Sequence, residues 1–183
     1  LNAAPGAEGR QVDVKDWKKL DLPHDWSIFF DFDHNSPAQN EGGQLNGGDA
    51  WYRKTFRLDD KDLDKKVRLE FGGVYMDSKV YVNGQFVGHY PNGYNAFSYD
   101  ITPYLREGEN DLLIWLGQGW YKTTTFGAAY EGPLVKAELD VLRNGKWEVV
   151  TKTDGSWYGR ESGYSDTGTW RALQFGGERV DGR

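Results

Sequence analysis

The sequence predicts an all-β fold, either a sandwich or a barrel, for a chain of 183 residues. Two observations support this prediction. Short apolar runs alternate with polar residues at a period of two, and turn signals rich in glycine and asparagine separate them. The composition agrees, with 24 Gly, 8 Trp and 11 Tyr, because aromatic residues are enriched in strands. The length allows one domain with a substantial core.

The regular strands are expected to begin at Trp51, with the first two at residues 51–58 and 67–71. In a half-buried strand, every second side chain faces the core. The side chains predicted to face inward in these two strands are Tyr52, Lys54, Phe56, Leu58, Val67, Leu69 and Phe71.

Two Asn-Gly pairs, at residues 83–84 and 144–145, each separate two apolar runs. This is the strongest short-range signal for a β-hairpin. Residues 111–117 are apolar on both faces, which predicts a central strand and places Trp115 in the core. One helical turn is expected at residues 102–105.

The whole chain, residues 1–183, is predicted to be a single module in which residues 51–183 supply the sandwich strands. Residues 1–50 lack sustained alternation. We expect them to form an extended arm packed on the sandwich, with Trp17 and Trp26 as anchors.

Charge and composition exclude several classes of function. The net charge of −6 argues against a nucleic-acid partner, since phosphates require a basic surface. No apolar run approaches the roughly 18–20 residues that span a bilayer, so no membrane partner is expected. The absence of Cys excludes disulfides and thiolate metal sites. The chain does not begin with Met, which suggests a processed polypeptide or an expressed fragment. No signal peptide is present, and its earlier removal is left open.

No motif positions a catalytic group. The G-x-S-x-G elbow of serine hydrolases is missing, and His24, His34 and His89 are widely spaced. Carboxylates such as Glu70, Glu107, Glu138 and Glu148 are expected to be solvated charges, so no catalytic residue is predicted. No cofactor is predicted. Asp31, Asp33 and Asn35 offer oxygen ligands that would suit a structural Ca²⁺, although a solvated loop is the favoured interpretation, and Ca²⁺ is left unassigned.

Sugar binding is the chemistry that the sequence favours. Aromatic rings stack on the apolar face of a pyranose, and polar side chains bond its hydroxyls. Such residues gather in three predicted loops, at residues 90–95, 118–121 and 126–131. The predicted ligand-binding residues are Tyr94, Asn95, Trp120, Tyr121 and Glu131. The alternative for Tyr94 and Trp120 is packing at the rim of the sandwich.

Several motifs resemble the sugar-binding domain of family 2 glycoside hydrolases over about residues 18–116. They are LPHDWSI, GGDAWYRKTF, LEFGGVYMDSKVYVNGQFVG and GYNAFSYDITPYLREGEN. The resemblance implies a jelly-roll, galactose-binding-like β-sandwich. In that family the domain is an accessory to a separate catalytic domain, which is the partner expected here.

The later segments LGQGWYKTTTFG, GPLVKAELDVL, DGSWYGRESGYSDTGTW and FGGERVDGR resemble the N-terminal domain of family 78 α-L-rhamnosidases. The combined resemblance implies a non-catalytic N-terminal module of a bacterial exo-glycosidase, rhamnosidase-like and periplasmic or extracellular. Two alternatives stay open. One is the sugar-binding domain of a family 2 β-galactosidase, and the other is a structural buttress without a ligand. L-rhamnose and galactose are the implied sugars.

Overall fold

A computed structural model describes residues 13–24, 31–35, 49–74, 77–93, 95–117, 135–161, 164–166 and 178–180. Over these residues every regular element is a strand, apart from two short 3-10 turns at Asp60–Asp62 and Thr102–Tyr104. The all-β prediction is confirmed, and the helical turn expected at residues 102–105 is one of the two 3-10 turns.

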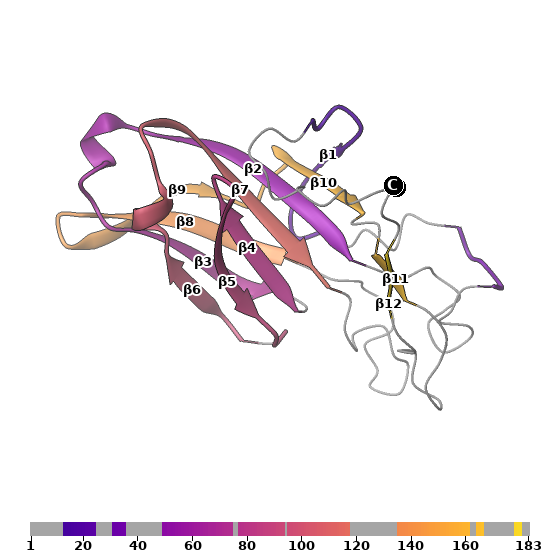
Figure 1. The fold of residues 1–183 in the computed structure, drawn as a ribbon. Coiled ribbons are helices and arrows are strands. Elements are labelled where there is room, and N and C mark those ends of the chain that lie inside the picture. Colours follow the sequence, from indigo (N-terminus) through magenta and orange to yellow (C-terminus); the bar gives the residue numbers. More distant parts are fainter. Residues whose placement is uncertain are drawn as a thin grey trace.

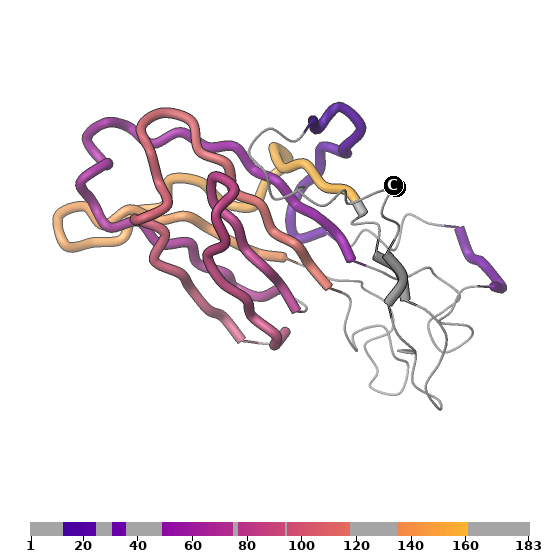
Figure 2. The backbone as a smooth tube through the Cα atoms, in the orientation of Figure 1, coloured from indigo at the N-terminus to yellow at the C-terminus, as the bar shows by residue number. Residues whose placement is uncertain are grey.

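The strands form two antiparallel sheets that face each other (Figure 1). The six-stranded sheet has the order β1 (Lys18–Leu20), β10 (Trp157–Glu161), β2 (Ala50–Leu58), β7 (Gly108–Leu116), β4 (Ser78–Val82) and β5 (Gln85–Tyr90). The four-stranded sheet has the order β6 (Phe97–Asp100), β3 (Val67–Val74), β8 (Val135–Arg143) and β9 (Lys146–Lys152). A separate pair joins β11 (Tyr164–Asp166) to β12 (Glu178–Val180). Figure 2 shows the chain crossing between the two main sheets after β2 and after β5.

The main core lies between the two sheets and uses the alternation that the sequence shows. The predicted inward side chains of residues 51–58 and 67–71 are all buried. They meet inward residues of the other strands, including Val80, Leu112, Ile114, Val135, Leu139 and Trp157. Burying one such side chain contributes about 1.5–3 kcal/mol. The buried Lys54 ammonium is satisfied because it contacts Ser156 and lies 3.3 Å from an Asp154 carboxylate oxygen.

Strand β7 is buried on both faces, as its sequence predicts. Leu112, Ile114 and Leu116 enter the main core. Leu113 joins a second cluster with Trp17 and Trp51 on the outer face of the six-stranded sheet, against which Trp115 packs.

Trp115 packs against this outer core cluster and not in the core between the sheets, which adds a location to the prediction that it is a core residue. Trp115 alternates with Ile114, so its ring points to the outer face of the sheet and stays partly exposed. There it stacks on Trp51, with ring centroids 5.7 Å apart and an interplanar angle of 19°.

Both predicted hairpins are confirmed. Asn83 and Gly84 have φ values of 52° and 78°, and Asn144 and Gly145 have φ values of 51° and 76°. Positive φ at both central positions is typical of the type I′ turn, which matches the twist of the flanking strands. These turns join β4 to β5 and β8 to β9.

A buried amide ties the first hairpin to the start of β7. Asn110 is 0% exposed, and its Oδ1 accepts hydrogen bonds from Asn83 Nδ2 at 2.9 Å and from the Arg106 backbone N–H at 3.0 Å. Its own Nδ2 donates to the Arg106 and Gly108 carbonyls. The Asn83 amide also donates to the Tyr104 carbonyl at 2.8 Å. Because every polar atom of Asn110 is paired, its burial fixes the positions of these turns.

The N-terminal segment contributes a strand that the sequence did not predict. Lys18–Leu20 forms β1, the edge strand that pairs with β10, and Leu22 enters the main core. Trp17 is buried in the outer cluster. Trp26, the other predicted anchor, lies outside the described residues.

An ion pair whose Asp62 carboxylate is buried fastens the 3-10 turn at Asp60–Asp62 to the β8–β9 hairpin. The Arg143 guanidinium donates to both carboxylate oxygens of Asp62. These hydrogen bonds lower the pKa of Asp62 below its usual range, because they stabilise the charged carboxylate.

The two sheets also touch where edge strands β5 and β6 lie next to each other. Tyr90 of β5 stacks on Phe97 of β6, with ring centroids 3.9 Å apart. At Gly88 the β5 backbone approaches the Tyr99 ring so closely that an added Cβ would lie 2.7 Å from the ring Cζ. A side chain larger than hydrogen does not fit there unless the ring moves.

We therefore predict that Gly88→Ala lowers the free energy of unfolding by about 1–3 kcal/mol, the usual cost of overpacking. Urea unfolding followed by tryptophan fluorescence measures this change. The control is Gly73→Ala in β3, where an added Cβ meets nothing within 4 Å, and which should change stability by less than about 0.5 kcal/mol. Equal effects of the two substitutions would contradict this account of the closed edge.

Candidate functional site

The predicted loops leave the sandwich at one end. In the six-stranded sheet, Ala50 pairs with Leu116 and Ser78 pairs with Tyr90. The start of β2 and the start of β4 therefore lie beside the ends of β7 and β5. Val74 pairs with Val135 in the other sheet. The chain segments after Tyr90 and after Leu116 therefore emerge together, at what we term the loop end.

Of the predicted ligand-binding residues, the structure describes Asn95. It lies in the connection between β5 and β6, and its side chain is exposed. Tyr94, Trp120, Tyr121 and Glu131 lie outside the described residues. Their assembly with Asn95 into one site stays a prediction.

The loop end carries polar side chains that the sequence analysis did not select. His89 Nε2 lies 2.5 Å from Asp77 Oδ1, and Lys79 Nζ lies 3.8 Å from the centre of the Trp115 ring. Asp77 adopts a φ of 55°, in the left-handed region that Asp tolerates better than most residues. These groups can donate and accept hydrogen bonds next to partly exposed aromatic rings, which is the chemistry that recognises sugar hydroxyls.

A β-bulge explains why these residues were missed. A regular two-residue hairpin at Asn83-Gly84 would place Lys79 opposite Gly88. The register instead shifts between Val80 and Tyr81, so that Lys79 pairs with His89. Nothing in the sequence identifies this bulge.

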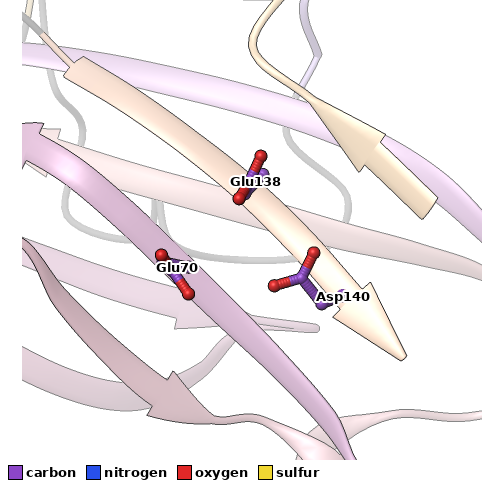
Figure 3. Close-up of side chains that lie close together, drawn as sticks. All are labelled: Glu70, Glu138 and Asp140. Carbon is purple, nitrogen blue, oxygen red and sulfur yellow. The ribbon is translucent and has the colours of Figure 1, made fainter. Parts of the chain in front are cut away.

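Three carboxylates gather on the outer face of the four-stranded sheet (Figure 3). Glu70 of β3 and Glu138 and Asp140 of β8 each have an oxygen within 4.8 Å of the others. Arg68 lies among them, with Nε 3.0 Å from Asp140 and Nη2 2.8 Å from Glu70. Its guanidinium carbon also lies 4.4 Å from the centre of the Trp147 ring.

A cation of the protein itself thus neutralises part of this acidic group. Glu70 and Glu138 lie at the outward strand positions that the sequence predicts, where both are partly buried, and Glu70 is paired with Arg68. Glu107 and Glu148 are exposed as expected, and Glu148 lies 3.0 Å from Arg143.

The Asp31–Asn35 segment adopts a local turn in which the Asn35 backbone N–H donates to Asp33 Oδ1 at 2.8 Å. This is an Asx-type hydrogen bond, which forms without a metal. Binding of Ca²⁺ by this segment stays a prediction.

His24 has the structural role that the sequence suggested. Its Nδ1 lies 3.1 Å from the hydroxyl of Tyr52, which also donates to the His24 carbonyl. Burial lowers the pKa of His24, and the charge of Lys18 lowers it further. The neutral imidazole is therefore the form that this contact favours.

The described residues form a hollow of about 310 Å³ at the end of the sandwich opposite the loop end. Its lining combines the cations Arg57 and Lys61 with the acids Asp59, Asp60 and Glu107. Mixed charges in an open hollow do not indicate a particular ligand.

Within the described part of the chain, no helix is long and apolar enough to cross a membrane.

Comparison with known families gives two overlapping matches. Residues 12–127 match the sugar binding domain of glycosyl hydrolases family 2. Residues 73–183 match the α-L-rhamnosidase N-terminal domain. Each match covers more than half of the chain.

Among curated proteins, a β-galactosidase from Bacteroides ovatus is 53% identical over 98 residues, which are 54% of this chain and 12% of that protein. The chain therefore spans about an eighth of the length of this relative.

Solved structures share the fold. A β-glycosidase from Bacteroides vulgatus superposes with a TM-score of 0.56 at 24% identity, over 87% of this chain and 27% of that one. An α-L-rhamnosidase from Streptomyces avermitilis, solved with L-rhamnose, superposes with a TM-score of 0.59 at 22% identity, over 75% of this chain and 14% of that one. At these identities the likeness establishes the jelly-roll type of β-sandwich and nothing finer.

The family matches and the sandwich agree with the motifs that the sequence shows. The chain belongs to the N-terminal sugar-binding domains of glycoside hydrolases, and it matches both the family 2 domain and the α-L-rhamnosidase N-terminal domain.

Proposed function

We propose that this chain is the non-catalytic N-terminal module of a bacterial exo-glycosidase, and that it binds a sugar at its loop end. The observation that carries the proposal is the pair of family matches, which overlap on residues 73–127. The overlap includes β4 to β7 and the segments that leave the sandwich at the loop end.

Two kinds of parent enzyme are each supported by a specific observation. The match of residues 73–183 to the rhamnosidase domain includes the closing segment Gly177–Arg183 and supports a rhamnosidase-like parent. The identity of 53% to a β-galactosidase supports a family 2 parent. Activity of the full-length protein on aryl α-L-rhamnosides or on aryl β-galactosides separates the two.

The parent's catalytic domain is the proposed partner, and the periplasm or the extracellular space is the proposed location. The proposed ligands are sugars of plant polysaccharides, such as L-rhamnose or galactose. A structural Ca²⁺ is compatible with the oxygen ligands of Asp31, Asp33 and Asn35, which is why Ca²⁺ is included in the binding test below.

The arrangement of carboxylates supports a module without catalysis of its own. Glycosidases place an acid and a second carboxylate on opposite sides of the scissile bond. Glu70, Glu138 and Asp140 instead lie on one face of a sheet, where Arg68 neutralises two of them.

The isolated 183-residue chain is therefore expected to release no nitrophenol from aryl β-galactosides or aryl α-L-rhamnosides above the uncatalysed rate. Release of nitrophenol is measured by absorbance, with full-length parent enzyme as the positive control. Turnover that disappears when Glu70 or Glu138 is changed to Gln would contradict the non-catalytic assignment.

Sugar binding is expected to be weak, with a Kd of roughly tens of micromolar to millimolar, because one stacked ring and a few hydroxyl contacts provide about 4–6 kcal/mol. Titration with L-rhamnose and with galactose, with Ca²⁺ present, is followed by NMR chemical shifts. Asn95→Ala should weaken binding several-fold, and Trp120→Ala should abolish it. Asn95→Ala should leave the melting temperature within a few degrees, since the side chain is exposed.

Gln85→Ala is the matched control, because Gln85 is also exposed but follows the turn at the far end of β5. It should change neither affinity nor stability. If the wild-type chain shows no shift with either sugar at high-millimolar concentration, the chain is a buttress for its catalytic domain. If Trp120→Ala unfolds the chain, Trp120 is a packing residue.

A further inference from the structure

Arg160 lies on the outer face of the six-stranded sheet and has no acidic partner among the residues that the structure describes. Arg160 of β10 pairs across the strands with Trp51 of β2. On its other side, the guanidinium carbon lies 4.9 Å from the centre of the Trp17 ring, and Trp17 directly precedes β1. Arg160 therefore lies between a tryptophan of the neighbouring strand β2 and a tryptophan that directly precedes β1.

Within the described part of the chain, the Arg160 guanidinium forms no ion pair and no hydrogen bond, and its Nε is buried without an acceptor. Arg53, in the same sheet, shows the usual arrangement, with Nη2 2.9 Å from Asp111. Burial lowers the pKa of Arg160 from its usual range, because a charge removed from water needs a counter-charge. The residue as a whole is partly buried, and the two terminal nitrogens of its guanidinium are not among the buried unpaired atoms, so these two nitrogens keep some exposure.

The two flanking tryptophans also have unused donors. The indole Nε1–H groups of Trp17 and Trp51 are buried and have no acceptor among the described residues. Trp17 is 6% exposed and Trp51 is 5% exposed. A buried donor without a partner is rare in folded proteins, and leaving one unpaired costs about 1–3 kcal/mol.

These groups share one property, which is that each donates hydrogen bonds and none accepts them. Lys19 pairs with Tyr158, two residues before Arg160 on β10, and supplies an exposed cation on the same face of the sheet. The planar guanidinium presents its N–H groups in a fork that matches the two oxygens of a carboxylate.

We propose that Arg160, with Trp17 and Trp51, forms a binding site for the carboxylate of a small ligand, such as a sugar acid. The site lies on the outer face of β10 and β2 and uses none of the predicted loop residues. It is an addition to the proposed function and does not depend on binding of neutral sugars at the loop end.

The test is a titration of the 183-residue chain followed through the indole N–H resonances in ¹⁵N–¹H NMR spectra. Trp17→Phe and Trp51→Phe assign the two resonances. Sodium glucuronate, glucose and sodium acetate are added separately, and sodium chloride keeps the ionic strength constant, since exposed charges are screened by salt.

We expect glucuronate to shift the Trp17 and Trp51 resonances in a saturable way and glucose to leave them unchanged. Arg160→Gln should weaken glucuronate binding at least tenfold. The matched control is Arg57→Gln, which removes one exposed positive charge from the hollow at the other end of the sandwich. It should bind glucuronate like the wild-type chain.

Acetate tests whether the site recognises the carboxylate alone or the carboxylate together with the sugar ring. If acetate shifts the resonances as glucuronate does, the carboxylate alone is recognised. If only glucuronate does so, the sugar ring contributes as well. The proposal is overturned if glucuronate produces no saturable shift, if glucose or chloride produces the same shift, or if Arg160→Gln binds as the wild-type chain does. Should Arg160→Gln fail to fold, Arg160→Lys, which keeps the charge but loses the planar fork, must still weaken binding.

Discussion

Burial of β7 on both faces is the constraint on which the rest of the structure depends. On the inner face, Leu112, Ile114 and Leu116 need the four-stranded sheet opposite them. On the outer face, Leu113 needs a cover, which Trp17 and Trp51 provide. A strand that is apolar on both sides is stable only where both sides are covered. The N-terminal segment that carries Trp17 is therefore part of the fold, and it also brings Trp17 to Arg160.

The loop end is positioned from the opposite end of the same strands. The buried amide of Asn110 and the partly buried amide of Asn83 join the β4–β5 turn, the 3-10 turn before β7 and the first residues of β7. From there β5 and β7 run to the loop end, where Asp77, Lys79 and His89 lie. The rigid hairpin therefore sets where the loops begin, while the loop sequences supply the ligand chemistry.

Much of the fold could be predicted from the sequence, because period-two alternation and the Asn-Gly turns are local signals. Residues 51–58 and 67–71 and both hairpins have the predicted form. Contacts and strand pairings between residues far apart in the sequence could not be predicted. The sequence did not show which face Trp115 packs on, because the outer cluster that it joins includes Trp17, almost a hundred residues earlier. Strand β1 was missed because three residues are too short to show a period, and the pairing of Lys79 with His89 depends on a bulge.

Native-state hydrogen exchange, combined with one substitution, tests the central role of β7 most directly. The amides of Leu112–Leu116 should exchange only through global unfolding and be among the slowest in the chain. Trp17→Ala should lower their protection and the global stability together, by about 3–5 kcal/mol. Trp147→Ala, on the outer face of the other sheet and 40% exposed, should have a much smaller effect. The account is contradicted if β7 exchanges by local opening while β3 and β8 stay protected, or if Trp17→Ala leaves protection of β7 unchanged.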